Sequence, residues 1–276
     1  MLASGVRILK AERIVLVKVW EENEKGQDMS MEEKAMEIVK ITEHISYIKA
    51  SGQPLSADVI LVEGQEYLYA FDVGNNEKVA EYLNSIPKKK RVILSHFHTD
   101  HMGNIGRVSW ESVYFGANTE KYFQHYIKDY VAQRFAELPQ ALEGIFGESN
   151  DLQNNEMKVG RSPRYVTVFE PVIISDGIAL EIHPVPNSHA KGSLLLQAEG
   201  EYIFLGDSLY SKADGDNQVY NAQLLKEEIE LLRKLPGTQI FSSHEKRPLK
   251  TKAGVLRFLE QIYAKRDKNN AFIRVG

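Results

Sequence analysis

The sequence contains no cysteine among its 276 residues, and this absence narrows the available chemistry. Without cysteine the chain has no disulfide framework, no thiolate nucleophile and no sulfur ligand for a metal ion. Any bound metal must therefore be held by histidine, aspartate or glutamate.

Long hydrophobic runs are missing as well. No apolar stretch approaches the roughly 20 residues needed to span a bilayer. Residues 1–10 lack the basic-then-apolar layout of a signal peptide. We therefore expect a cytoplasmic protein that does not bind membranes.

Neither sign of charge dominates, since 34 Lys and Arg oppose 38 Asp and Glu and give a formal net charge of −4. This balance excludes the overall basic surface typical of nucleic-acid-binding proteins. Residues 245–276 are locally basic, with nine basic and three acidic side chains. Such a segment is typical of solvated helix faces; the alternative is contact with an anionic substrate or a neighbouring subunit. The expected partner is a small-molecule substrate, not a nucleic acid or a membrane, and a homodimer stays open.

Strand-like and helix-like patterns are interleaved along the whole chain, which indicates a layered α/β fold. The β-branched and apolar runs that predict strands are Arg13–Trp20, Ile45–Ala50, Asp58–Val62, Tyr67–Asp72, Arg91–Ser95, Val113–Gly116, Arg164–Phe169, Ile178–Val185, Ser193–Ala198, Tyr202–Leu205 and Gln239–Ser242. The patterns that predict helices are Ser30–Ile41, Asn76–Ser85, Thr119–Phe146, Ala222–Lys234 and Thr251–Lys265. No repeat or long linker divides the sequence, so we expect a single domain over residues 1–276.

Two segments resemble additions to this domain. Residues 1–42 carry a strand and a helix of their own, and residues 117–164 form a helical insertion and a loop. Within the insertion, Tyr122, Tyr126 and Tyr130 are four residues apart. Such a stripe is most often packed in a core or a subunit contact, and the alternative is a wall of the substrate pocket. The sequence leaves open whether the loop Ser149–Arg164 is a lid.

Four candidate metal ligands follow one predicted strand within six residues. After Ser95 the sequence reads His96-Phe-His98-Thr-Asp100-His101. His96 and His98 are two residues apart, so in extended backbone both imidazoles point to the same side. A single histidine is most often structural, but three histidines and an aspartate at one strand end indicate a metal site.

This turn alone is too small for two ions, because a divalent ion such as Zn²⁺ needs three or four ligands. Further candidates lie just beyond later strands, at His189, Asp207 and His244. Functional side chains of α/β folds commonly gather at one edge of a sheet. We therefore expect these residues to converge on the first four.

The whole set resembles the metallo-β-lactamase fold superfamily of metallohydrolases. The family's His-x-His-x-Asp-His motif matches residues 96–101, and its later His, Asp and His match His189, Asp207 and His244. The resemblance covers roughly residues 43–244. It implies an α/β fold built as a four-layer αββα sandwich, with metals at one edge between the sheets.

By this resemblance two divalent ions are expected, zinc first, with manganese or iron as alternatives. One ion would bind His96, His98 and His189, and the other Asp100, His101 and His244, with Asp207 bridging. Two such ions share a water and lower its pKa, which supplies hydroxide to attack the substrate. Asp100 and Asp207 are the carboxylates expected to act in this step. Asp72, which matches the family's Asp-x-Gly motif, would orient a histidine ligand.

The function expected from these residues is a metal-dependent hydrolase of a small-molecule ester, lactone, thioester or phosphoester. Tyr210 lies three residues after Asp207, as a tyrosine does in quorum-quenching lactonases, so a lactonase is the leading specific hypothesis. Its phenol would then donate a hydrogen bond to the substrate oxygen. The alternative is a packed tyrosine whose hydroxyl is bonded to backbone or solvent.

Two other classes stay open. Iron-dependent oxidoreductases of this fold, such as persulfide dioxygenases, use the same His-x-His-x-Asp-His motif, and imidazole and carboxylate suit iron as well as zinc. A non-catalytic metal-binding protein is disfavoured, because such relatives usually lose ligands and here none is lost.

Overall fold

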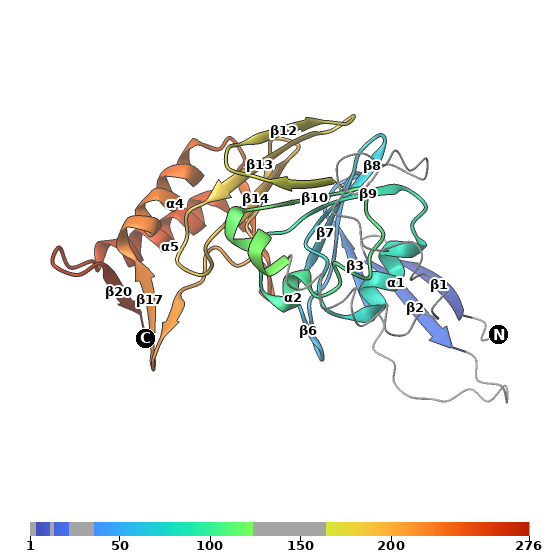
Figure 1. The fold of residues 1–276 in the computed structure, drawn as a ribbon, viewed down its shortest axis with the longest axis horizontal. Coiled ribbons are helices and arrows are strands. Elements are labelled where there is room, and N and C mark those ends of the chain that lie inside the picture. Colours follow the sequence, from blue (N-terminus) through green and yellow to red (C-terminus); the bar gives the residue numbers. More distant parts are fainter. Residues whose placement is uncertain (1–3, 12–13, 22–35, 124–163, 276) are drawn as a thin grey trace, which may run out of the picture.

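The larger of two main sheets has nine strands, in the spatial order β1-β2-β3-β4-β7-β8-β9-β10-β11 (Figure 1). The computed structural model describes residues 36–123 and 164–275 fully and residues 4–11 and 14–21 as backbone. The nine strands are β1 (Ser4–Ala11), β2 (Ile14–Glu21), β3 (Met36–Lys40), β4 (Ile45–Ile48), β7 (Val59–Glu63), β8 (Tyr67–Phe71), β9 (Lys89–Ile93), β10 (Ser112–Phe115) and β11 (Arg164–Thr167). Strands β8 to β11 run parallel, and the other neighbours pair antiparallel.

The second main sheet has six strands in the order β12-β13-β14-β15-β18-β19. They are β12 (Val172–Ser175), β13 (Ala179–Val185), β14 (Ser193–Ala198), β15 (Tyr202–Phe204), β18 (Gln239–Phe241) and β19 (Leu249–Thr251). Two small sheets accompany it, formed by β16 (Lys212–Asp214), β17 (Asn217–Asn221) and β20 (Phe272–Val275), and by β5 (Ser51–Gly52) and β6 (Leu55–Ser56).

Helices cover the outer faces of the two main sheets. They are α1 (Glu77–Ser85) on the large sheet, and α4 (Ala222–Lys234) and α5 (Lys252–Ala264) on the six-stranded sheet. The one-turn helix α2 (Thr99–Met102) follows the loop after β9. The N-cap residues of α1, α4 and α5 are Asn76, Asn221 and Thr251, and each accepts a backbone N–H of the first turn with its side chain. Such caps satisfy donors that the first helical turn leaves unpaired. Among the described residues, no helix combines the length and apolar character needed to cross a membrane.

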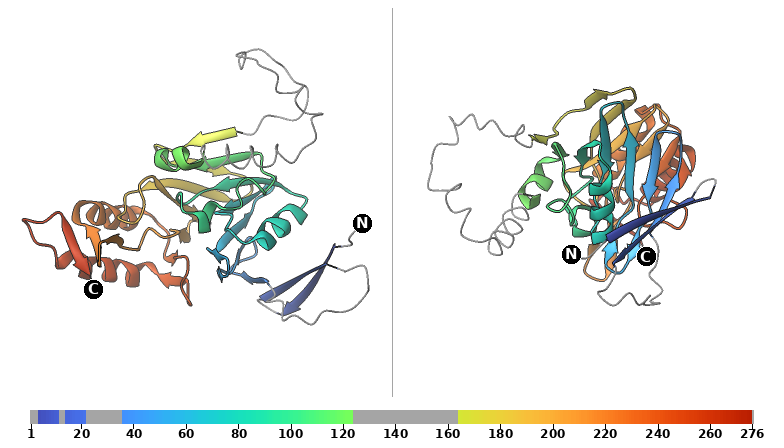
Figure 2. Two further views of the ribbon diagram at one scale, coloured as in Figure 1. Left: turned by 60° about the horizontal axis from the view of Figure 1, so that its bottom comes forward. Right: turned by 90° about the vertical axis from the view of Figure 1, so that its right-hand side faces the viewer.

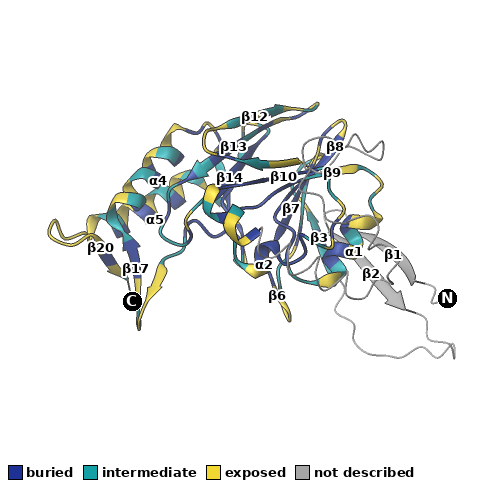
Figure 3. Ribbon diagram, in the orientation of Figure 1, coloured by how far each residue is buried: buried dark blue, intermediate teal, exposed yellow. Residues whose placement is uncertain are grey.

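Three separate hydrophobic cores show that the molecule has four layers (Figure 3). Leu83 of α1 packs in the first core, against the large sheet. Phe71 and Phe204 lie in the second core, between the two sheets. Leu232 of α4 and Leu259 of α5 lie in the third, against the six-stranded sheet. The αββα sandwich implied by the family resemblance is confirmed.

Alternation along the central strands explains how one strand serves two cores. In β7, Val59 and Leu61 face the helix side, whereas Ile60 and Val62 face the other sheet. Successive side chains of a strand point to opposite faces, so an all-apolar strand is buried on both. This two-sided burial fixes the register of each strand and therefore the position of the loop that follows it.

The structure corrects the expected helix Ser30–Ile41. Its second half forms strand β3, which pairs antiparallel with both β2 and β4. The β-branched Ile38 and Val39 suit a strand, and two neighbours supply backbone partners that outweigh local helical preference. Residues 30–35 lie outside the described part of the chain.

The remaining differences concern short or terminal elements. The hairpin of β1 and β2 extends the large sheet (Figure 2), and the sequence indicated only its second strand. Small strands such as β16 and β20 were also not expected. Residues 117–123 of the expected insertion form a helix. Tyr126, Tyr130 and residues 149–163 lie outside the part of the chain that the structure describes.

Candidate metal centre

Seven potential metal ligands meet at one end of the sandwich, on loops from both sheets. His96 and His98 follow β9 of the large sheet, and the one-turn helix α2 then presents Asp100 and His101. The other three candidates follow β13, β15 and β18 of the second sheet, at His189, Asp207 and His244. Their ligand atoms fall into two groups, and within each group all atoms lie within 4.8 Å of one another.

The first donor group consists of three imidazoles. His96 Nε2 and His98 Nδ1 are 2.9 Å apart, and His189 Nε2 lies 3.1 Å from the same His98 nitrogen. Burial, more than any neighbour, lowers the pKa of each of these histidines. All three are therefore neutral near pH 7, which is the form that binds a metal, and their ligand atoms lie within 4.8 Å of one another.

The second donor group adds two carboxylates to two imidazoles. Asp100 Oδ2 lies 3.0 Å from His244 Nε2, and Asp207 Oδ2 lies 3.3 Å from His101 Nε2. Burial alone would lower the pKa of His101, but the carboxylates of Asp72 and Asp207 raise it to about 10. Burial likewise opposes ionisation of Asp100 and Asp207, yet the histidines lower the pKa of both. Without a metal ion, a proton on the His101 ring is therefore favoured between the carboxylates of Asp72 and Asp207, and a divalent ion bound at Nε2 would replace it.

Asp207 touches both groups. Its Oδ2 lies 3.3 Å from His101 Nε2, 3.5 Å from His189 Nε2 and 3.7 Å from His244 Nε2. Its other oxygen, Oδ1, is buried and has no hydrogen-bond partner among the described residues. A buried carboxylate oxygen without a donor is costly unless a cation binds it. The residues present therefore fit two divalent ions that share this carboxylate.

Comparison with known families agrees with this arrangement. The family model of the metallo-beta-lactamase superfamily matches residues 52–244. The chain belongs to the metallo-beta-lactamase superfamily. Superfamily members have dinuclear metal sites, and this chain has two groups of candidate metal ligands. No curated protein matches the sequence.

Solved structures of this superfamily share the fold at low sequence identity. An archaeal superfamily protein from Sulfolobus tokodaii aligns with a TM-score of 0.54 and 18% identity, covering 82% of this chain and 88% of that one. A stereoselective inverting sec-alkylsulfatase from Pseudomonas sp. also gives 0.54, with 16% identity, over 82% of this chain and 41% of its own. Rubredoxin oxygen:oxidoreductase from Desulfovibrio gigas gives 0.55, with 12% identity, over 84% and 63%. These likenesses show the fold alone.

The metallo-beta-lactamase fold also places Asp72 and Ser95 behind the ligands. Asp72 Oδ2 accepts a hydrogen bond from His101 Nδ1 at 2.7 Å, as expected for a residue that orients a ligand. Ser95 Oγ lies 2.7 Å from Asp72 Oδ2 and 2.9 Å from His96 Nδ1. These contacts direct the Nε2 atoms of His96 and His101 into the site. Such partners orient ligands and tune metal affinity.

Gly206 makes room for this network. It has a positive φ of 56°. A Cβ added there would lie 2.7 Å from both Cβ and Oγ of Ser95. Glycine is therefore required at this position for two independent reasons, its backbone conformation and the closeness of Ser95.

Tyr210 adopts one of the two arrangements that its spacing left open. Its hydroxyl donates a 2.6 Å hydrogen bond to the backbone carbonyl of Ser243. Its ring centre lies 6.1 Å from that of His189. Burial raises the pKa of Tyr210 to about 12, so the phenol keeps its proton. The hydroxyl is thus engaged with the loop that carries His244, and its catalytic role stays a prediction.

Sequence reasoning missed Asp58, which is almost fully buried beside the site. Its two oxygens accept backbone N–H groups from Ala50 and His244, each at 2.9 Å. Burial raises the pKa of its carboxyl group. An aspartate before an apolar strand resembles an ordinary strand start, and nothing in the sequence links it to His244. By contrast, a role for Ser95 in positioning a ligand could have been predicted, because it is adjacent to His96 in the sequence.

The predicted insertion reaches the site through Tyr122. Its ring stacks on that of Phe97, with centroids 4.1 Å apart and planes 13° apart. Phe97 lies between two ligands, so residues 117–123 are attached directly beside the metal centre. Tyr122 is half-exposed.

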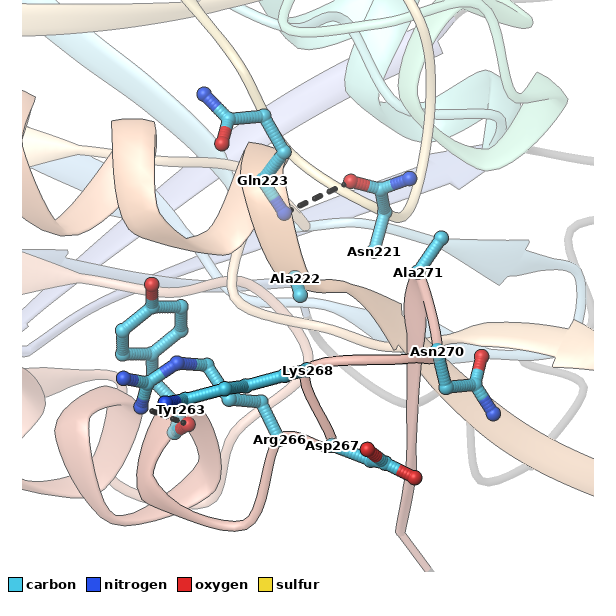
Figure 4. A pocket seen from close by; sticks show the side chains of 9 residues that line it. All are labelled: Asn221, Ala222, Gln223, Tyr263, Arg266, Asp267, Lys268, Asn270 and Ala271. Atoms are coloured by element: carbon cyan, nitrogen blue, oxygen red, sulfur yellow. Dashed lines mark hydrogen bonds between the residues drawn. The ribbon is translucent and has the colours of Figure 1, made fainter.

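A surface pocket of about 310 Å³ lies elsewhere, between the start of α4 and the end of α5 (Figure 4). Arg266 and Lys268 are among its lining residues, together with Asn221. The backbone N–H of Asn221 donates to Ser188 Oγ at 2.8 Å, next to the His189 ligand. None of the seven candidate ligands lines this pocket.

Proposed function

We propose that the protein is a dinuclear metal-dependent hydrolase that cleaves a small-molecule ester, lactone, thioester or phosphoester. The observation that carries this proposal is the position of Asp207, whose Oδ2 lies within 3.7 Å of imidazole nitrogens from both donor groups. A carboxylate in this position would be able to bind both ions and so hold them in one centre. The absence of cysteine also favours attack by water over attack by a thiolate.

Two divalent ions held here would activate a water for attack and polarise the substrate oxygen. His96, His98 and His189 present neutral imidazoles to the first ion. Asp100 and Asp207 are ionised at neutral pH, because neighbouring histidines lower their pKa values. The Asp100 side chain is 16% exposed, so its carboxylate would be able to accept the proton that the attacking water loses.

Zinc is the ion we propose, because its usual oxygen and nitrogen ligands are the carboxylates and imidazoles found here. A lactone is the first substrate to test, on the strength of the Tyr210 spacing. Two neighbours widen the test set: one is described as an alkylsulfatase and another as a B3 metallo-beta-lactamase with an active-site glutamic acid. A small-molecule partner and a cytoplasmic location belong to the same proposal.

The experiment begins with metal-free protein reloaded with Zn²⁺. Elemental analysis is expected to give two ions per chain, because seven ligands exceed what one tetrahedral ion uses. The reloaded protein is then assayed on lactone, ester, thioester, phosphoester, sulfate ester and β-lactam substrates. At most one ion with excess Zn²⁺, or no turnover on the whole set, contradicts the proposal. Iron in freshly purified protein, with oxygen-dependent turnover of a persulfide, would favour the oxidoreductase alternative.

A further inference from the structure

His244 has an unusual backbone conformation for a metal ligand. Its φ is +65°, in the left-handed region that residues with a side chain rarely adopt. Such a conformation persists only where the surrounding structure enforces it. The contacts that enforce it therefore determine where the imidazole lies.

Those contacts hold the peptide group between Ser243 and His244 from both of its ends. The carbonyl oxygen of Ser243 accepts the Tyr210 hydroxyl at 2.6 Å, and the N–H of His244 donates to Asp58 Oδ2 at 2.9 Å. In a trans peptide the C=O and N–H point in opposite directions. A rotation of this peptide, which would let φ of His244 change sign, must therefore break both hydrogen bonds.

Each anchor is itself fixed to another part of the metal centre. The N–H of Tyr210 donates to the carbonyl of Asp207 at 2.9 Å, so its ring is attached to the bridging ligand's loop. On the opposite side, the N–H of Ala57 donates to the carbonyl of Asp100 at 2.9 Å, one residue before Asp58. Three ligands of the second donor group are thus linked through one peptide.

We infer that Asp58 and Tyr210 form a clamp on the Ser243–His244 peptide that positions His244 and thereby sets the affinity of the second metal ion. Both are positioning residues, and the clamp gives Tyr210 a role other than hydrogen bonding to substrate. The inference rests on the metal-binding part of the proposed function. The first donor group contains no atom of this peptide, so its ion should be nearly unaffected.

The test is a titration of the metal-free protein with Zn²⁺ against a competing chelator, which resolves the first and second equivalents. Asp58→Asn keeps the side chain's shape, but the two N–H groups bind different oxygens, and the amide nitrogen that replaces one oxygen cannot accept, so one of these hydrogen bonds is lost. Tyr210→Phe deletes the other hydrogen bond and keeps the ring. In each variant the second ion should bind about 10- to 100-fold more weakly, as for other residues that support ligands. The first ion should change by less than about threefold.

Asp176→Asn is the matched control. Asp176 also accepts two backbone N–H groups, from Glu66 at 2.8 Å and Tyr67 at 2.9 Å, but neither is near a metal ligand. This variant should lower thermal stability but should not weaken the binding of the second ion relative to that of the first. Because Asp58 and Tyr210 hold one peptide, the double variant should cost less than the sum of the two singles.

The outcomes distinguish this inference from the function on which it rests. Fewer than two ions in the unaltered protein contradicts the proposed function. If the unaltered protein binds two ions, two results contradict the clamp. One is that the variants Asp58→Asn and Tyr210→Phe weaken the binding of both ions equally, and the other is that they change neither affinity. Activity adds a second criterion: saturating Zn²⁺ should restore turnover of Tyr210→Phe, whereas a loss of tenfold or more that persists at saturation assigns the phenol to substrate and contradicts a purely positioning role.

Discussion

Replacement of Asp207 by alanine is the most direct perturbation of the proposed centre. The side chain is buried, and its Oδ2 lies 3.3 Å from His101 Nε2 and 3.5 Å from His189 Nε2, one in each donor group. Alanine removes the shared carboxylate and leaves the apolar strand β15 before it unchanged. The change therefore acts on the centre and not on the sandwich.

The size of the effect follows from what remains. Each group keeps three protein ligands, the number that catalytic zinc sites use, so metal should still bind. What is lost is the ligand that fixes one ion relative to the other. Loss of a single donor in an oxyanion site costs about 2.7–4 kcal/mol, and each 1.36 kcal/mol is tenfold in rate. We expect kcat to fall by about 10²–10³.

The assay compares kcat on the best substrate with metal content and thermal stability of the same preparation. His183→Ala is the control, because His183 pairs with Glu181 at 3.0 Å and belongs to neither donor group. It should stay within about tenfold of the parent protein. Near-parental turnover of Asp207→Ala with two ions bound would refute the shared-carboxylate mechanism.

Three further predictions concern stability. Each donor group joins ligands from both sheets, so Zn²⁺ at 100 times its Kd should stabilise the fold by about 2.7 kcal/mol per ion; an unchanged urea midpoint after loading would contradict this. Without metal, the pKa of His101 is about 10 against 6.5 when unfolded. The contribution of His101 to the free energy of unfolding, at most about 5 kcal/mol, should be complete below pH 6.5 and lost as pH rises towards 10. Urea denaturation across this range should show the decline, and Asp72→Asn should flatten it. Gly206→Ala should cost about 1–3 kcal/mol for the crowding of Ser95 alone, measured by urea denaturation, and an unaltered stability would show that the loop can move aside.

The central strands could be predicted from sequence because burial on both faces leaves a clear signature. Strand β14 coincides with the predicted Ser193–Ala198, all of whose residues are buried. Helix α4 coincides with Ala222–Lys234, where a capping Asn221 and spaced apolar residues agree. Strand β3 is an element whose type could not be predicted from its local sequence. Its residues fit a helix or a strand, and only pairing with β2 and β4 decides.

The metal ligands could be predicted from sequence for a different reason. His, Asp and His residues directly after apolar strands are recognisable one by one, and the fold brings them together. The residues that position these ligands have no such recognisable place in the sequence. Asp58 and His244 are 186 positions apart and meet through a backbone N–H, which no side-chain spacing records. The positive φ of His244 is likewise a product of tertiary contacts.

The distribution of ligands over the two sheets explains why this chemistry depends on the sandwich. His96 and His98 come from the large sheet and His189 from the other, and the second donor group is divided in the same way. Neither sheet alone could bind either ion with more than two of these side chains. The core between the sheets, with Phe71 opposite Phe204, sets the spacing on which both groups depend. Because close-packed interiors transmit small volume changes, this inter-sheet core and the clamp at His244 act on the same variable, the position of second-sheet ligands relative to the β9 loop.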